Sequence, residues 1–344
     1  MIEELRKKYD SENLYQVLVD YHTQISYALE HSYKVTEFPK MDFKNIIVCG
    51  LGGSAISADF MKNFSKNELK LPMTVWRNYG LPTFADENSL VICSSYSGNT
   101  EETIEALNAA IEKKCSIVTI TTGGKVLQIA AEHNIPVVPL LPGFQPRFTL
   151  GMSFFALLHV MVQTGVLPEQ STMAHDAIEL WKTKSVEYSS ETGYVYKLAE
   201  QLNGFLPLAY SGADVNDSIG NRLKCQFNEN SKLHCFVNVI PELNHNEIIG
   251  WEAHSDNTLK TKVLYLTDPE FPPQVQKRFD VLRGLIQKAG VEVITLESTQ
   301  PTFKLRLLDM AYLMDWLSYF VAVQRGYDPA EIDYIHFLKK ELAK

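Results

Sequence analysis

Short apolar runs alternate with segments of helical length along the first half of the chain. The runs that predict buried strands are residues 46–50, 73–76, 90–95, 116–121 and 136–141. Helix-length segments lie between several of them, notably 54–67 and 99–114. The runs show no polar alternation, which is typical of strands covered on both faces, so the pattern predicts a parallel sheet flanked by helices.

The same pattern returns in the second half. The expected strands there are residues 206–212, 233–239, 262–267 and 291–296, and the main expected helices are 218–231 and 273–289. Further helices are predicted over 2–31, 148–165, 171–203 and 305–325, and over the C-terminal segment after Gly326 and Pro329. The chain is therefore predicted to be an α/β protein with two doubly wound subdomains, residues 1–168 and 169–344. The two halves share little sequence, so the repeat is one of topology.

Charge and composition narrow the possible partners. The 344 residues carry a net charge of −9, which argues against nucleic acid and against an anionic membrane surface as partners. The five cysteines form no C-x-x-C pair, which fits a reducing cytoplasm. No apolar run is long enough to span a membrane, and the N-terminus carries no apolar signal region. We expect a cytoplasmic protein.

A glycine-rich loop follows the first predicted strand. Gly50, Gly52 and Ala55 have the spacing of a dinucleotide-binding fingerprint, and amides at the start of a helix attract anions. Binding of a nicotinamide dinucleotide also needs an acidic residue at the end of the second strand, about 20 positions on. The residues there are 77–79, Arg-Asn-Tyr, which disfavours a dinucleotide. Tight glycine packing without any ligand is the simpler alternative.

A hydroxyl-rich loop follows the third predicted strand. Ser95, Ser97 and Thr100 supply hydroxyl donors, Gly98 allows a tight turn, and a helix begins near residue 100. Hydroxyls and amides at a helix start can hold a phosphate monoester. Both loops leave neighbouring strands at the carboxyl edge of the sheet, where doubly wound folds bind ligands. A sugar-phosphate site is the favoured interpretation, and an ordinary capped turn is the alternative.

The motifs resemble a known family. GGS (52–54) and SYSGNTEE (95–102) resemble the sugar isomerase (SIS) domain. NENSK (228–232), PELNHNE (241–247) and FLKKEL (337–342) resemble the bifunctional phosphoglucose/phosphomannose isomerases of archaea and bacteria. The match runs from about residue 20 to the end. It implies a homodimeric isomerase that interconverts glucose 6-phosphate, mannose 6-phosphate or both with fructose 6-phosphate through an enediol.

The resemblance also implies roles for particular residues. The phosphate-binding residues would be Gly53, Ser54, Ser95, Ser97 and Thr100. Glu229 matches the family's catalytic base, and His245 matches an acid/base that opens the sugar ring from the partner subunit. Lys339 matches a lysine that assists ring opening, although the adjacent Lys340 is an alternative. Arg147 would stabilise the enediolate, unless it forms an ion pair between the domains.

The family's glycine loop usually has Met and Gly where this chain has Leu51 and Ser57. Leucine keeps the volume of methionine, but Ser57 adds bulk where glycine allows a close approach. We expect no cofactor and no metal, because the nine histidines show no metal-ligand spacing. Two other functions stay open: a sugar-phosphate sensor without chemistry, and an SIS isomerase of another sugar phosphate. Dual specificity for glucose and mannose is also left open.

Overall fold

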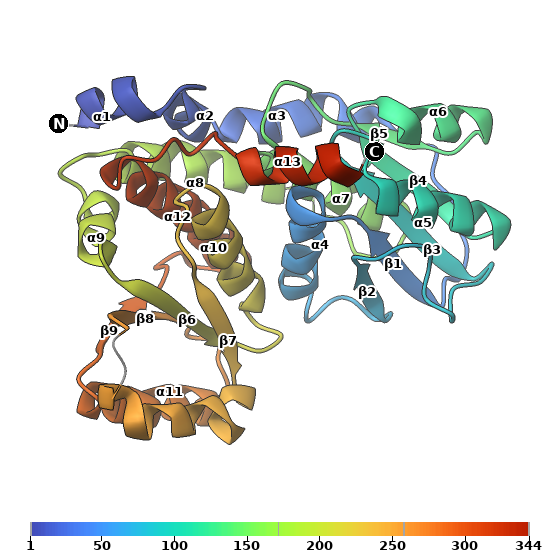
Figure 1. Cartoon of the computed structure of the whole chain (residues 1–344). Helices are drawn as coiled ribbons and strands as arrows, with labels where there is room; N and C mark the ends of the chain where they lie inside the picture. The colour runs from blue at the N-terminus through green and yellow to red at the C-terminus, as the bar shows by residue number, and fades with distance from the viewer. Residues whose placement is uncertain (1, 171, 257–258, 343–344) are drawn as a thin grey trace. The chain divides into compact units, whose positions relative to one another are not determined.

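The computed structural model describes residues 2–170, 172–256 and 259–342. The chain divides into two compact units, one of residues 20–181 and the other of residues 1–19 with 182–344 (Figure 1). Each unit has its own sheet, and each is described by itself.

In the unit of residues 20–181, strands pair in the order β2-β1-β3-β4-β5, and every pair is parallel. The strands are β1 (Asn45–Cys49), β2 (Met73–Trp76), β3 (Ser89–Ser95), β4 (Ser116–Thr121) and β5 (Val137–Pro139). The helices are α3 (His22–Glu30), α4 (Gly52–Phe64), α5 (Glu101–Glu112), α6 (Gly124–Glu132) and α7 (Leu150–Gln163), with 3₁₀ turns η1 (Ser32–Lys34) and η2 (Pro146–Phe148). All residues of β3 are buried, as expected of a strand covered on both faces.

The second unit repeats this topology with the order β7-β6-β8-β9, again parallel throughout (Figure 1). Its strands are β6 (Leu206–Gly212), β7 (Phe236–Ile240), β8 (Thr261–Leu266) and β9 (Glu292–Leu296). Its helical elements include α9 (Tyr194–Leu202), α10 (Asp217–Glu229), η3 (Glu242–His245), η4 (Glu247–Asp256), α11 (Pro273–Lys288) and α12 (Phe303–Gln324), while α8 (Met173–Tyr188) spans the boundary between the units. The α/β class and the two parallel, helix-flanked sheets are confirmed.

Helix α12 forms the centre of the second unit. Nineteen of its 22 residues are buried, and it packs against α9 and α10. Its buried side chains include charges that are paired: Arg222 of α10 bonds both oxygens of Asp315, at 2.7 and 2.6 Å. Arg306 bonds both oxygens of Asp268, at 2.8 and 3.0 Å. In the described part of the chain, no helix is both long and apolar enough to cross a membrane.

The N-terminal segment differs from its prediction as one helix. It forms α1 (Ile2–Tyr9), α2 (Leu14–Val19) and α3, because Asp10 accepts hydrogen bonds from the amides of Leu14 and Tyr15 and so starts a new helix.

Residues 1–19 belong to the second unit, whereas the prediction assigned them to the first subdomain. The reason is their contact with α12: Tyr319 donates to Asp10 at 2.8 Å, and Tyr312 donates to the carbonyl of Leu18 at 2.6 Å. The other boundary between the units lies between residues 181 and 182, and the predicted one lay between 168 and 169.

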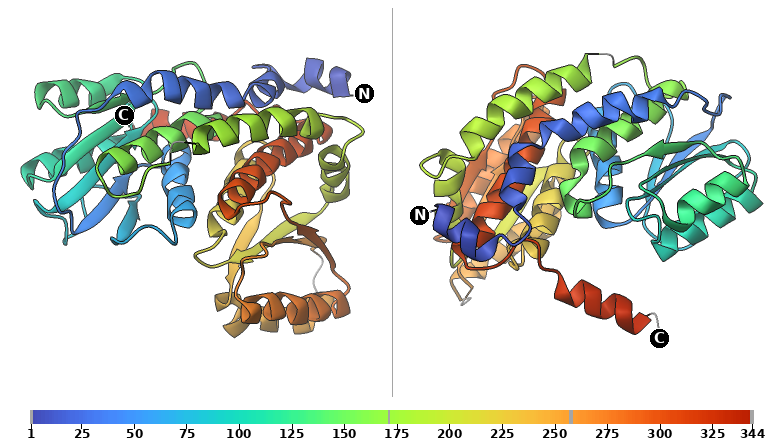
Figure 2. Two further views of the ribbon diagram at one scale, coloured as in Figure 1. Left: turned by 180° about the vertical axis from the view of Figure 1, so that it is seen from behind. Right: turned by 90° about the horizontal axis from the view of Figure 1, so that it is seen from above.

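The last helix, α13 (Asp333–Leu342), is exposed along its whole length, and Figure 2 shows it as the last helix before the C-terminus. Its exposed large apolar residues are Tyr334, Ile335, Phe337, Leu338 and Leu342.

We expect Asp315→Asn to lower the free energy of unfolding by about 3 to 5 kcal/mol, because it leaves the Arg222 charge buried without its counter-charge. Urea unfolding measures the loss. The matched control is Glu187→Gln, which removes the exposed carboxylate that pairs with Lys184 and should change stability by at most about 1 kcal/mol. Equal effects of the two substitutions would contradict the prediction.

Candidate active site

The two motif loops of the first unit meet at the carboxyl edge of its sheet. The chain leaves β1 toward β2 on one side, whereas β3 pairs on the other side of β1. Connections from neighbouring strands therefore diverge here, and this is the position at which doubly wound sheets bind ligands. The glycine loop follows β1 and the serine loop follows β3, so the fold places both at this position.

The glycines of the first loop allow close backbone contacts. A Cβ atom at Gly50 would lie 2.8 Å from the carbonyl oxygen of Ser94, and one at Gly53 would clash with the backbone of Pro146 and Arg147. Gly52 has φ +50° and begins α4. The lack of a side chain at Gly53 lets the turn that carries Arg147 approach the start of α4.

A hydrogen bond joins the two loops. The hydroxyl of Ser54 accepts from the amide of Tyr96 at 3.0 Å. Tyr96 in turn donates its phenol to the carbonyl of Leu141 at 2.8 Å and accepts from the amide of Phe144 at 2.9 Å. Burial raises the pKa of Tyr96, so the phenol stays protonated as a donor. Ser54 and Tyr96 thus fix the glycine and serine loops relative to each other.

The serine loop is shaped by its own hydrogen bonds. The hydroxyl of Ser95 donates to Thr100 Oγ1 at 3.0 Å and accepts from the amide of Gly98 at 3.1 Å. The hydroxyl of Ser97 accepts from the amide of Asn99 at 3.3 Å. Gly98 has φ +67°, and a Cβ atom there would overlap the carbonyl of Gly123.

These hydrogen bonds show which hydroxyls of the two loops act as donors and which as acceptors. Ser54, Ser97 and Thr100 act as acceptors in them, so their own protons are not used and can point to an anion. Ser95 is only 1% exposed, and its hydroxyl donates its proton to Thr100. Its position is therefore better suited to stabilising the loop than to contacting a ligand directly. Thr100 is also the N-cap of α5, whose first amides attract negative charge.

Arg147 lies in η2, directly after the glutamine and proline of the QPRF segment. It is 4% exposed, donates to Gln145 Oε1 at 3.3 Å and lies over the ring of Phe148 at 5.5 Å. Its backbone approaches the start of α4, and its buried guanidinium is always charged. The same unit therefore holds the arginine and both loops.

Ser57, the departure from the family's glycine, does not obstruct the loop. It is 1% exposed, and its hydroxyl donates to the carbonyl of Ser54 at 3.0 Å within α4. Its bulk is taken up by the protein interior.

In the second unit, Glu229 is the last residue of α10 and is partly exposed. Its neighbours on both sides are held in place: Asn228 accepts from the amide of Cys235 at 3.3 Å, and Asn230 is fully buried. Glu229 therefore lies at the end of a well-anchored helix.

His245 ends the short helix η3 and is exposed. The segment that carries it is anchored by Glu247, which accepts from the phenol of Tyr210 and, at 2.6 Å, from the side-chain amide of Asn238. Burial, together with the Glu247 carboxylate, raises the pKa of Tyr210 and keeps it a donor. Glu247 thus holds this segment in place, and His245 is exposed beside it.

The neighbours of Lys339 and Lys340 along α13 distinguish the two lysines. On a helix, residues three and four apart are neighbours. Lys339 lies beside Ile335 and Leu342 at the edge of the apolar face, whereas among the described residues Lys340 has Phe337 as its apolar neighbour. If the apolar face of α13 is covered, Lys339 lies closer to the covering surface.

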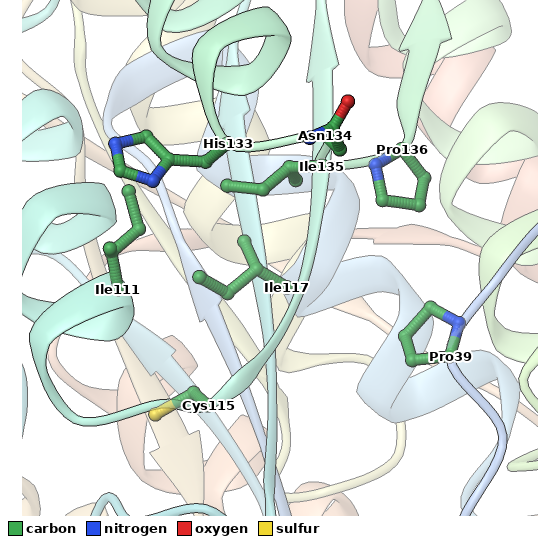
Figure 3. A pocket seen from close by; sticks show the side chains of 8 residues that line it. All are labelled: Pro39, Ile111, Cys115, Ile117, His133, Asn134, Ile135 and Pro136. Carbon is green, nitrogen blue, oxygen red and sulfur yellow. The ribbon is translucent and has the colours of Figure 1, made fainter.

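Two surface hollows lie away from the glycine and serine loops. One of about 370 Å³ opens at the amino ends of β4 and β5, lined by Ile111, Cys115, Ile117, Ile135 and others (Figure 3). This is the opposite edge of the sheet from the glycine and serine loops. Another, of about 300 Å³, lies between η3, η4 and α11 beside Asn244, the neighbour of His245. In the described ranges, no three His, Cys, Asp or Glu residues cluster as metal ligands would.

Comparison with known proteins identifies the family. The family model of the bacterial phospho-glucose isomerase C-terminal SIS domain matches residues 191–342. A bifunctional phosphoglucose/phosphomannose isomerase from Caldicellulosiruptor bescii is 34% identical over 307 residues, covering 88% of this chain and 91% of that protein. The chain belongs to the family of bifunctional phosphoglucose/phosphomannose isomerases. The family predicted from the motifs is confirmed.

Two further comparisons place this isomerase family among its relatives. A D-glucosamine-6-phosphate 4-epimerase from Sulfolobus acidocaldarius is 30% identical over 215 residues, 62% of this chain and 66% of that protein. The solved C-terminal domain of a glucosamine-fructose-6-phosphate aminotransferase from Francisella tularensis superposes with a TM-score of 0.66 at 14% identity, covering 92% of this chain and 97% of that one. The second likeness shows the SIS fold. The roles of individual residues remain predictions.

We expect Gly98→Ala to weaken binding of glucose 6-phosphate at least about tenfold, because the added methyl displaces the Gly98–Gly123 contact and with it the loop hydroxyls. Isothermal titration calorimetry measures the dissociation constant. Gly165→Ala is the control: Gly165 has a similar φ of +77° but open space around its Cβ position. It imposes similar backbone strain and should leave binding unchanged, so equal weakening in both variants would contradict a specific role of the serine loop.

Proposed function

We propose that this protein interconverts glucose 6-phosphate and mannose 6-phosphate with fructose 6-phosphate, without a metal or cofactor, by proton transfer through an enediol. The observation that carries the proposal is the pairing of the glycine and serine loops at one sheet edge in a chain of this family. The protein would act in the cytoplasm.

The phosphate would bind between the starts of α4 and α5. Amides at both helix starts and the hydroxyls of Ser54, Ser97 and Thr100 would donate to its oxygens, with Gly53 and Ser95 shaping the loops. This arrangement suits a phosphate monoester in a protein with a net charge of −9, because local donors replace an attractive overall field.

The chemical step would use Glu229 as the base. Its carboxylate would take the proton from C2 of the open-chain aldose and return it to C1, while the proton of the C2 hydroxyl passes to the C1 oxygen. The C2–H bond breaks and a C1–H bond forms, so substrate and product are isomers. Arg147 would stabilise the negative oxygen of the enediolate, because a fixed guanidinium needs no reorganisation when that charge develops.

Ring opening would need a separate acid and base. His245 is the candidate, because an imidazole can both donate a proton to the ring oxygen and accept one from it. We assign it to the active site of the partner subunit in a homodimer. Its exposure supports this, as do large exposed apolar side chains on the adjoining surface, namely Ile249 of η4 and Val281 and Leu285 of α11. Lys339 would assist, in preference to Lys340, because of its place beside the apolar face of α13.

Glucose 6-phosphate and mannose 6-phosphate differ only in configuration at C2, and both give the same enediol. A base that reaches C2 in both epimers therefore suffices for dual activity. The remaining alternatives are a sensor that binds without turnover and an enzyme that acts on a different sugar phosphate. The similarity to a D-glucosamine-6-phosphate 4-epimerase is the reason to keep the alternative of a different sugar phosphate.

We expect purified protein in EDTA to form fructose 6-phosphate from both glucose 6-phosphate and mannose 6-phosphate, measured by coupled assays. Glu229→Gln should lower kcat by a factor of about 10³ or more and leave binding of 5-phosphoarabinonate within about twofold, because only the proton acceptor is lost. Glu242→Gln, which changes an exposed carboxylate on η3, is the control and should keep full activity.

Binding of 5-phosphoarabinonate without turnover of either substrate would favour the sensor. Loss of activity in EDTA that added Mg²⁺ or Zn²⁺ restores would contradict the metal-free mechanism. Turnover of a different sugar phosphate alone would assign the other isomerase function.

Mixed dimers test whether His245 acts across the interface. Glu229→Gln and His245→Ala should each be inactive as homodimers. Refolded together in equal amounts, they should recover about a quarter of the wild-type activity, because half of the dimers are mixed and each mixed dimer has one intact site. If His245 serves its own chain, no mixed site contains both residues and the mixture stays inactive.

A further inference from the structure

The residues that follow Glu229 in the NENSK segment are bound to α12. The side-chain amide of Asn230 donates to Ser318 Oγ at 3.0 Å, and the hydroxyl of Ser231 donates to the Ser318 carbonyl at 2.7 Å. Asn230, Ser231 and Ser318 are each 0% exposed. The hydroxyl of Ser318 in turn donates to the carbonyl of Asp315 at 2.8 Å. Ser318 therefore joins the end of α10 to the backbone of α12.

A second attachment lies one turn earlier on both helices. Asp315 accepts from Arg222 on both oxygens, and from the side-chain amide of Gln226 at 2.6 Å. These groups are at most 2% exposed. Arg222, Gln226 and Asn230 are spaced four residues apart, so they form one polar stripe of α10 that faces one stripe of α12.

A third attachment lies beyond the helix end. Arg325 donates to the carbonyl of Ser231, and Lys232 donates to the carbonyl of Asp328. Lys232 has φ +48°, a conformation that non-glycine residues seldom adopt. The residues that follow Glu229 are thus hydrogen-bonded to the segment at the end of α12, as the helix before Glu229 is bonded to α12 itself.

We propose that Ser318, through Asn230, is a positioning residue that sets the location of the Glu229 carboxylate. The inference rests on the proposed role of Glu229 as the base. Apolar side chains alone would let α10 shift along α12 with little loss of contact, whereas a buried hydrogen bond fails when its partners separate. Asn230 is the next residue after Glu229, so the Asn230–Ser318 bond constrains the helix end that carries the base. Proton abstraction depends steeply on such placement, and an error of about 1 Å can cost about 10²-fold.

The test is Ser318→Ala, which removes the acceptor of Asn230 and leaves the carbonyl that Ser231 binds. We expect kcat to fall about tenfold to 100-fold with KM nearly unchanged, because the phosphate loops belong to the other unit. Glucose 6-phosphate with deuterium at C2 should show a larger isotope effect on kcat, since a displaced base slows C2–H cleavage relative to the other steps. A smaller folded fraction would lower kcat without changing the isotope effect.

Ser298→Ala is the matched control. Ser298 is also a buried serine, and its hydroxyl donates at 2.6 Å to Asp309 of α12, away from Asn230. It should lose similar stability and keep the wild-type kcat and isotope effect. Asn230→Ala removes the same bond from the α10 side. It should reproduce the kinetics of Ser318→Ala, and it replaces that variant if the latter does not fold.

Wild-type kcat and isotope effect in folded Ser318→Ala or Asn230→Ala would overturn the positioning role and leave the proposed function intact. Kinetics of Ser318→Ala that match those of Ser298→Ala would overturn it too. An inactive wild-type protein, or full activity in Glu229→Gln, would overturn the proposed role of Glu229 and the positioning role together.

Discussion

The parallel pairing of β1 with β3 is the constraint on which the candidate binding site depends. Their register places Cys49, the last residue of β1, beside Cys93, two residues before the end of β3. The backbones then come so close that position 50 has no room for a side chain next to Ser94. From this point the chain turns into α4 on one side and toward α5 on the other. Two helix starts, whose first amides have no partner within the helix, thus lie at the same edge of the sheet, and the bond from Tyr96 to Ser54 links them.

Much of this architecture could be predicted from the sequence. Strands buried on both faces appear as uninterrupted apolar runs, and β2, β4 and β6 have the predicted bounds. The N-terminal segment was harder, because its apolar spacing is compatible with one continuous helix. The break depends on the carboxylate of Asp10, which caps α2 and also binds Tyr319. A contact between residues 10 and 319 requires the folded unit, so local pattern could not reveal it.

The candidate site was predictable in its residues but not in its hydrogen bonding. The motifs identify Ser54, Ser95 and Thr100, since hydroxyls beside a helix start indicate an anion site. They cannot show that Ser95 donates to Thr100, because that bond depends on the turn at Gly98 and its contact with Gly123. The link between α10 and α12 was missed for a related reason. Its partners are far apart in sequence, and the apolar pattern that predicts both helices gives no register between them.

The buried polar stripe between α10 and α12 is best understood as a device for register. A buried ion pair such as Arg222–Asp315 contributes little net stability compared with apolar residues of the same volume, because desolvation offsets the attraction. Apolar residues would, however, accept several relative positions of the two helices. The starts of α4 and α5 need no such stripe, since the backbone contacts of the sheet edge fix them. A side chain that leaves a helix end is fixed only as well as the helix itself, and the polar stripe supplies that precision at Glu229.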